Sequence, residues 1–187
     1  MDPRRRLALA CLAAGATAAS LARAQAPDLY GARRDPAQHF FAPSLGSLKA
    51  DLAEARRLGK RAALIVFLSD DCPDCARMRR EVLSLSGVQD YFRRQFAPLA
   101  VDARGAAPIA DFAGRPTTGR DFAASQSVAR LPAFVFYDLD GKALARFDGE
   151  IRDAGEFVRL GEFVASGAYR TSTFAEYRDA ASSRRIR

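Results

Sequence analysis

Cys72 and Cys75 form a C-x-x-C pair, the spacing that most directly predicts chemistry in this sequence. Disulfide exchange needs a thiolate that attacks, an accessible sulfur, and a second thiol close enough to resolve the mixed disulfide. Two cysteines three positions apart on a helix meet the last requirement. The pair therefore predicts thiol–disulfide exchange. A structural disulfide is the alternative, but it would be a weak staple, because so short a loop hardly constrains the unfolded chain.

The residues around the pair predict where each cysteine lies. Residues 62–68 are an unbroken apolar run, typical of a strand buried on both faces. The pair follows closely, and Pro73 suits the first turn of a helix because its missing N–H would be unpaired there. Backbone N–H groups and the dipole at a helix start stabilise a thiolate. We therefore predict that Cys72 is the nucleophile and that Cys75, one turn further in, is the resolving thiol.

Charged side chains near the pair bear on the direction of electron flow. Acidic residues beside the nucleophile oppose thiolate formation, and arginines further along the helix offset them only in part. The acids are Asp70, Asp71 and Asp74, and the arginines are Arg77, Arg79 and Arg80. A less stabilised thiolate makes a weaker oxidant. The sequence therefore favours a protein that donates electrons.

The rest of the chain predicts an α/β fold around the pair. Apolar periodicity and turn residues predict helices at 45–58, from 73 onward, 88–93, 119–128, 157–164 and 174–180, and strands at 62–68, 96–101, 133–137 and 143–147. Pro98 predicts that its strand lies at an edge or bends. Residues 102–118, rich in Ala, Gly and Pro, predict an irregular insertion. This order gives a mixed central sheet with helices on both faces.

Three segments resemble the thioredoxin superfamily. They are FLSDDCPDC at 67–75, RLPAFVF at 130–136 and DLDGK at 138–142. The first is similar to that family's strand and redox motif, the second to its cis-proline loop and following strand, and the third to its hairpin. Residues 111–114 and 163–169 look more like the exported SoxW-type thioredoxin-like reductases. The resemblance extends over 45–177 and implies a thioredoxin fold with an insertion before the cis-proline loop and an extra C-terminal helix.

The resemblance also implies which residues contact a client protein. In that family the loop with the cis proline lies against the redox pair, so Leu131 and Pro132 are expected substrate contacts; an ordinary trans turn is the alternative. Pro73 and Asp74, between the cysteines, are expected to contact the same client. Two positions depart from the family. Val66 stands where many thioredoxins carry a buried acid, and Leu131 stands where a small β-branched residue is common; both bear on rate and partner preference rather than on the fold.

The N-terminus predicts export. Residues 1–24 combine an arginine run, an uncharged Ala/Leu-rich stretch too short to span a membrane, and a small-x-small cleavage site, as in a secretory signal peptide. Cleavage would remove Cys11 and leave the C-x-x-C pair as the cysteines of the mature protein. We predict an extended leader at 25–44, a thioredoxin-like domain at 45–180 and a basic tail at 181–187, located in the periplasm.

Composition excludes some function classes. The apolar fraction of 49% supports a packed core. Of the net charge of +7, residues 1–24 contribute +3 (four arginines against one aspartate), and the remaining +4 is scattered, which argues against nucleic-acid binding. His39 is the single histidine and is expected on the surface or in packing. Asp102 is expected to be a solvated loop acid, with a proton relay as the alternative.

Together these features predict a periplasmic thiol:disulfide oxidoreductase that reduces disulfides of client proteins, with no cofactor beyond the Cys72–Cys75 disulfide. The resemblance implies re-reduction by a membrane electron donor protein, and we expect a monomer. The alternatives are a net dithiol oxidase, a thioredoxin-fold copper carrier, since two thiolates can hold a soft ion, and a non-enzymatic binding module that uses the Leu131 groove. No resident metal is expected, because a closed zinc site needs four ligands.

Overall fold

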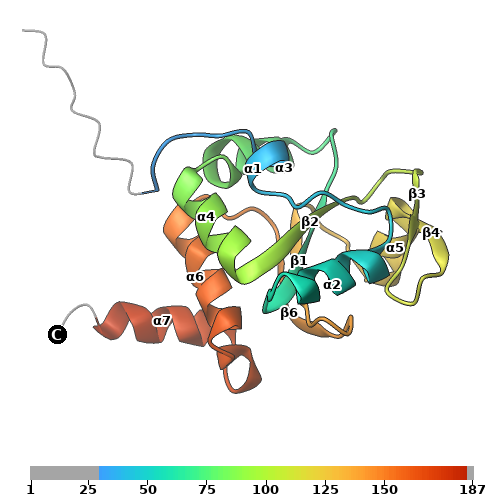
Figure 1. Cartoon of the computed structure of the whole chain (residues 1–187). Coiled ribbons are helices and arrows are strands. Elements are labelled where there is room, and N and C mark those ends of the chain that lie inside the picture. Colours follow the sequence, from blue (N-terminus) through green and yellow to red (C-terminus); the bar gives the residue numbers. More distant parts are fainter. Residues whose placement is uncertain (1–29, 185–187) are drawn as a thin grey trace, which may run out of the picture.

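The computed structural model of the chain describes residues 30–184 (Figure 1). The predicted signal peptide at 1–24, the first leader residues at 25–29 and the last residues at 185–187 lie outside the described residues. Within the described part, no helix is both long enough and apolar enough to cross a membrane.

A four-stranded mixed sheet forms the centre of the molecule. Its strands are β1 (Ala62–Leu68), β2 (Phe96–Asp102), β5 (Ala133–Tyr137) and β6 (Ala143–Asp148), in the order β2-β1-β5-β6. β1 pairs in parallel with β2 and antiparallel with β5, and β5 pairs antiparallel with β6. All four predicted strands are confirmed, and β2 lies at the edge, as Pro98 predicted, because proline has no N–H to donate to a neighbouring strand.

The central strand β1 is buried along its whole length because helices cover both faces of the sheet. Side chains alternate between faces along a strand. Leu64 and Val66 therefore join one core cluster, whereas Ile65 and Phe67 join the other. This double burial explains the unbroken apolar run.

Helices form two layers around the sheet. On one side lie α3 (Pro73–Met78), its π-helical continuation (Arg79–Leu83), α4 (Ser86–Gln95) and α6 (Ala154–Ala165); on the other lie α2 (Leu48–Arg57) and α5 (Gly119–Ser125). Figure 1 shows α4 and α6 side by side, and their rings Phe92 and Phe157 stack with centroids 4.3 Å apart. The predicted α/β thioredoxin architecture is confirmed.

The leader is more ordered than the predicted extended segment. It contains a helical turn, α1 (Pro36–His39), whose Ala37 N–H donates to the Asp35 carboxylate at 2.9 Å. Four residues are too few to show a helical period, so the pattern of the sequence did not reveal it. Phe40 is fully buried against the α4–α6 layer, and Ala42 donates to the Pro98 carbonyl of β2 at 2.7 Å. The leader thus packs as part of the domain.

The prediction of an irregular insertion at 102–118 was wrong in part. The segment contains a short hairpin of β3 (Pro108–Ala110) and β4 (Pro116–Thr118). Its turn is stabilised by Asp111, whose carboxylate accepts from the N–H groups of Ala113 and Arg115. A hairpin with a proline in each strand is tolerated because both strands are edges.

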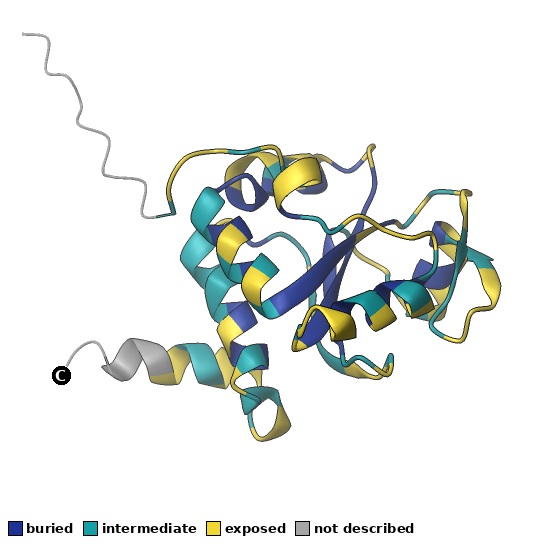
Figure 2. Cartoon of the chain, in the orientation of Figure 1, coloured by how far each residue is buried: buried dark blue, intermediate teal, exposed yellow. Residues whose placement is uncertain are grey.

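The last helix also continues beyond residue 180, where the domain was predicted to end. After a 3-10 turn (Ala168–Arg170), α7 (Phe174–Arg184) continues past residue 180 into the segment predicted as a tail. Figure 1 shows α7 projecting from the body, and Figure 2 shows exposed and intermediate residues along its described part. Its Phe174 and Tyr177 rings pack against Phe163 of α6. The predicted extra C-terminal helix is therefore present.

Candidate active site at Cys72 and Cys75

Cys72 and Cys75 are joined by a disulfide at the start of α3, with their Cα atoms 5.2 Å apart. Cys72 is the N-cap residue, in an extended conformation, and Pro73 is the first helical residue. The Cys75 N–H donates to the Cys72 Sγ at 3.1 Å. Such a donor would stabilise a Cys72 thiolate after reduction, because it is one of the N–H groups that a helix start leaves unpaired.

Both cysteines are buried, but Cys72 is the more exposed of the two. Cys72 is 7% exposed, whereas Cys75 is completely buried in the core cluster under α3. The attacking sulfur must meet a second protein, but the resolving sulfur needs only to reach its neighbour. The end of β1 fixes this placement, since the Leu68 carbonyl accepts from Ala103 N–H at 2.8 Å and the Ser69 carbonyl from Cys72 N–H.

The Leu131–Pro132 peptide bond is cis, as the resemblance implied. Pro132 is buried, and Leu131 is half-buried between the two core clusters. The Pro132 carbonyl accepts from Gly149 N–H at 2.8 Å, so this loop is tied to the residues that follow β6. Pro73 and Asp74 are exposed beside the disulfide.

The charge balance around Cys72 differs from the predicted excess of acid. Each of the three acids has an arginine partner. Asp70 pairs with Arg79 at 3.3 Å, Asp74 with Arg77 at 3.4 Å, and Asp71 with Arg104. Donation from the Ser69 hydroxyl, and then from Arg104, holds the pKa of Asp71 below its usual range. The predicted bias against the thiolate is therefore weaker than the sequence implied.

Two residues of this region escaped the sequence analysis. Arg104 lies after β2, and its nearness to Asp71 follows only from the parallel pairing that aligns Leu68 with Asp102. Glu150 lies after β6, and its carboxylate is only 8% exposed. It accepts from Arg77 of α3 at 2.8 and 3.0 Å and from Arg152 at 2.8 Å. The one sequence signal for Glu150 is its place directly after the strand that pairs with β5.

Glu150 links the two halves of the candidate site. Arg77 belongs to the helix that carries the cysteines, and Gly149, the neighbour of Glu150, donates to the Pro132 carbonyl. One buried carboxylate thus joins the redox helix to the cis-proline loop. An ion pair with one partner so buried is costly to break, because the remaining charge loses its counter-ion in a low dielectric.

The remaining candidates lie apart from the disulfide or in solvent. His39 is exposed on α1, as expected for a surface residue. Asp102 is exposed at the end of β2, and its carboxylate accepts from Arg104 N–H at 3.0 Å. Within the described residues, no group of three or more Cys, His, Asp or Glu side chains is arranged to hold a metal ion.

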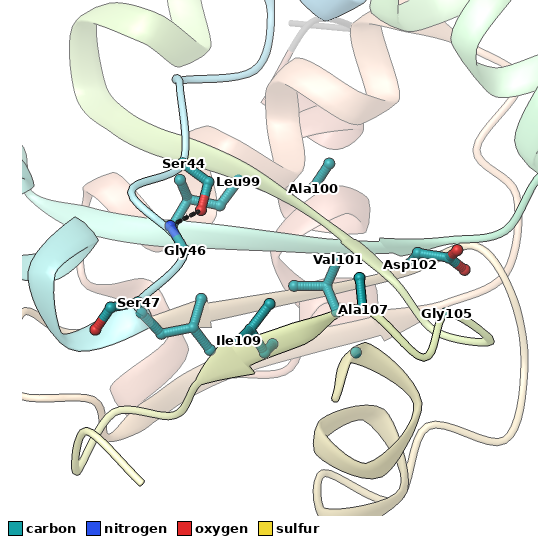
Figure 3. A pocket seen from close by; sticks show the side chains of 12 residues that line it. Ser44, Gly46, Ser47, Leu99, Ala100, Val101, Asp102, Gly105, Ala107 and Ile109 are labelled. Atoms are coloured by element: carbon teal, nitrogen blue, oxygen red, sulfur yellow. Dashed lines mark hydrogen bonds between the residues drawn. The ribbon is translucent and has the colours of Figure 1, made fainter. Parts of the chain in front are cut away.

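A separate small pocket lies beside β2 (Figure 3). Its volume is ≈ 90 Å³, and its lining comes from residues 44–48, from β2, from the segment that leads into β3 and from the start of α5. Leu48, Val101 and Ile109 are among its apolar side chains. Ser44 accepts from Gly46 N–H at 3.2 Å within it. Its lining includes neither cysteine, and Asp102 is its titratable member. The pocket therefore adds no nucleophile to the candidate site.

Comparisons with known proteins agree with this architecture. The family model of the thioredoxin-like domain matches residues 48–165. A thioredoxin-fold protein from Helicobacter pylori superimposes with a TM-score of 0.62 at 16% identity, over 78% of this chain and 93% of the other. The oxidoreductase DsbH superimposes with a TM-score of 0.50 at 19% identity, over 75% of this chain and 90% of the other. A search of curated protein sequences found no match. The family match covers more than half of the chain and spans both cysteines and the cis proline, so this protein belongs to the thioredoxin-like family.

Proposed function

We propose that the protein is an exported thiol:disulfide oxidoreductase that reduces disulfides in client proteins through Cys72 and Cys75, in the manner of the SoxW-type reductases that it resembles. The observation that carries the proposal is the disulfide at the start of α3, with Cys72 as the N-cap residue, 7% exposed, and Cys75 fully buried. A disulfide that closes a loop of four residues contributes little to stability. Thiol–disulfide exchange therefore explains better why this disulfide lies at the start of a helix.

The reaction begins with the reduced pair. The Cys72 thiolate attacks one sulfur of the client disulfide, a Cys72–client bond forms, and the client's other sulfur leaves as a thiolate that takes up a proton. Cys75 then gives up its proton and attacks the Cys72 Sγ. This second step forms the Cys72–Cys75 disulfide and releases the second client thiol. Two electrons pass from the pair to the client, and a membrane electron donor protein returns them.

Leu131 and Pro132 have the role of client contacts in this proposal. The support is their position in the cis-proline loop, which the Gly149 and Glu150 segment ties to the redox helix. The support for export is the arginine and Ala/Leu pattern of residues 1–24, which favours a periplasmic location for the reaction.

Net oxidation of client thiols is the second candidate. The observation that favours it is the pairing of Asp70, Asp71 and Asp74 with arginines, which removes part of the expected charge against a Cys72 thiolate. A protein whose reduced dithiol form is more stabilised is a stronger oxidant. Equilibration of the purified protein with glutathione separates the two directions: a potential near −270 mV supports a reductase, and one near −120 mV supports an oxidase.

The decisive experiment is trapping with Cys75→Ser in the exported compartment. The variant lacks the resolving thiol, so the Cys72–client disulfide persists and can be purified and identified by mass spectrometry. Cys72→Ser is the matched control, because it keeps one thiol but loses the nucleophile. Equal adduct formation by both variants, or failure of the wild-type protein to reduce any disulfide, would refute the proposal.

A further inference from the structure

A second surface feature adjoins the redox helix. A cleft of ≈ 780 Å³ lies between the leader and the helical segment that begins after Cys72. Figure 1 shows α1 of the leader next to α3. The side chains that line the cleft include Pro36 and Phe41 from the leader, Ala76 from α3, and the arginines Arg33, Arg79 and Arg80. Neither Leu131 nor Pro132 lines it, so it is distinct from the expected contact at the cis-proline loop.

Helical spacing connects this cleft to the nucleophile. Ala76 is four positions after Cys72 and donates its N–H to the Cys72 carbonyl at 3.0 Å. Arg79 and Arg80 come one further turn along the same helical segment. Residues three or four apart lie on one face of a helix. The cleft therefore begins one turn from Cys72 and continues away from it along the same face.

The charges on the rim favour an acidic occupant. Arg33 donates to two neutral groups, the Arg80 carbonyl and the Ser84 hydroxyl. Arg79 pairs with Asp70, whose side chain is 96% exposed, and Arg80 pairs with Glu81 on the surface. Such exposed pairs exchange partners at little cost. The lining also contains one acid, Asp35, but its carboxylate accepts from Ala37 N–H as the cap of α1.

We infer that this cleft binds an acidic, extended segment of the client polypeptide, an inference that rests on the proposed function. Guanidinium groups bind carboxylates through paired hydrogen bonds. The apolar parts of the segment contact the surface formed by Pro36, Phe41 and Ala76. From Cys72 to Arg80 the helix rises roughly 12 Å, the length of three or four residues in an extended chain. Preferred clients therefore carry Asp or Glu three or four positions from the reactive cysteine.

Designed peptides test this inference. Each peptide has one cysteine joined by a disulfide to 2-mercaptoethanol, with Glu, Gln or Lys at the third and fourth positions on both sides. We expect kcat/KM of the reduced protein to be about fivefold higher for the Glu peptide than for the Gln peptide at low salt, and lower for the Lys peptide. In Arg80→Glu, and in Arg33→Glu as a second variant, the preference should disappear or reverse.

The matched control is Arg57→Glu, which reverses an exposed charge in the last turn of α2. This turn precedes the start of β1, whereas Cys72 follows the end of β1. The control variant should keep the wild-type preference. Equal rates for the three peptides, or a preference for Glu that persists in both Arg80→Glu and Arg33→Glu, would overturn the inference.

Two further measurements separate this inference from the proposed function. Reduction of the neutral bis(2-hydroxyethyl) disulfide reports on thiol–disulfide exchange alone. Fluorescence anisotropy with serine in place of the peptide cysteine reports on the cleft alone, using the oxidised protein. If exchange fails but the Glu peptide still binds in an Arg80-dependent way, the proposed function falls and the acidic cleft stands. If exchange succeeds but no peptide is preferred in either assay, the cleft inference falls and the proposed function stands.

Discussion

The guanidinium of Arg104 pairs with the carboxylate of Asp71, the residue directly before Cys72. The two residues meet because β1 and β2 run in parallel and end together, with Leu68 aligned to Asp102. The charge of the acid that directly precedes Cys72 in the chain is therefore compensated by a residue that follows another strand. The redox properties of the pair should depend on Arg104 although it touches neither sulfur.

Replacing Arg104 tests this dependence. Arg104→Gln leaves Asp71 without its cation, so the Cys72 thiolate loses stabilisation and the reduction potential should become more negative. Because both side chains are exposed, the expected change is small, roughly 10 mV. Equilibration with glutathione measures it. Arg79→Gln should give a smaller change of the same sign, and Arg57→Gln none; a less negative potential in Arg104→Gln would contradict this account.

The ion pair between Arg77 and Glu150 should stabilise the site more than its exposed counterparts do. Glu150→Ala removes the buried partner of Arg77, so we expect the free energy of unfolding to fall by about 2 kcal/mol. A cycle of Arg77→Ala, Glu150→Ala and the double variant should give a coupling of about 1–2 kcal/mol in urea denaturation.

Arg152→Ala is the matched control for that cycle. Arg152 contacts the same Glu150 carboxylate, but its side chain is 73% exposed. Its loss should lower the free energy of unfolding much less than the loss of Arg77 does. If the Arg77 and Arg152 variants were equally destabilised, the link between the redox helix and the cis-proline loop would not be the stabilising contact that we describe.

Tyr137 should make the protein sensitive to alkali. Burial raises the pKa of Tyr137 to about 12, against about 10 for a phenol in the unfolded chain. Between these values the folded state keeps a proton that the unfolded state has lost, so stability falls as the pH rises from 10 to 12, by up to ~3 kcal/mol. Tyr137→Phe should remove this part of the decline.

The measurement is urea denaturation of both proteins at pH 8 and pH 11.5. At pH 8 the variant should be less stable by about 1 kcal/mol, because it loses the 2.7 Å hydrogen bond from the Tyr137 hydroxyl to Gln126. At pH 11.5 this difference should shrink or reverse. An equally steep decline in wild type and variant would show that Tyr137 does not cause the effect.

Gly119 should resist a substitution that usually stabilises helices. Glycine to alanine in a helix normally gains up to ~1 kcal/mol. Here an added Cβ would lie 2.3 Å from the Asp102 carbonyl oxygen, so α5 or the end of β2 would have to move. We expect Gly119→Ala to lower the free energy of unfolding by about 1–3 kcal/mol in thermal or urea denaturation. A gain in stability would show that the contact relaxes easily.

Local patterns in the sequence were enough to predict most of the fold. The apolar run at 62–68 predicted a strand covered on both faces, because only double burial removes the need for polar alternation. Cys72 before Pro73 predicted the cap and first turn of a helix, since both preferences act within a few residues. The β3–β4 hairpin and the helical turn α1 were missed, because they are too short to carry a period.

The sequence alone predicted the Cys72–Cys75 pair and the helix start that holds it, because the cap and first-turn preferences act between neighbours along the chain. Only the tertiary structure decided which charges surround that pair. Arg104 reaches Asp71 through strand pairing, Glu150 reaches Arg77 through packing of the segment after β6, and Arg33 reaches the π-helical segment through the leader. These contacts join residues far apart in the chain, and such pairings depend on the register and packing of whole elements rather than on local preference.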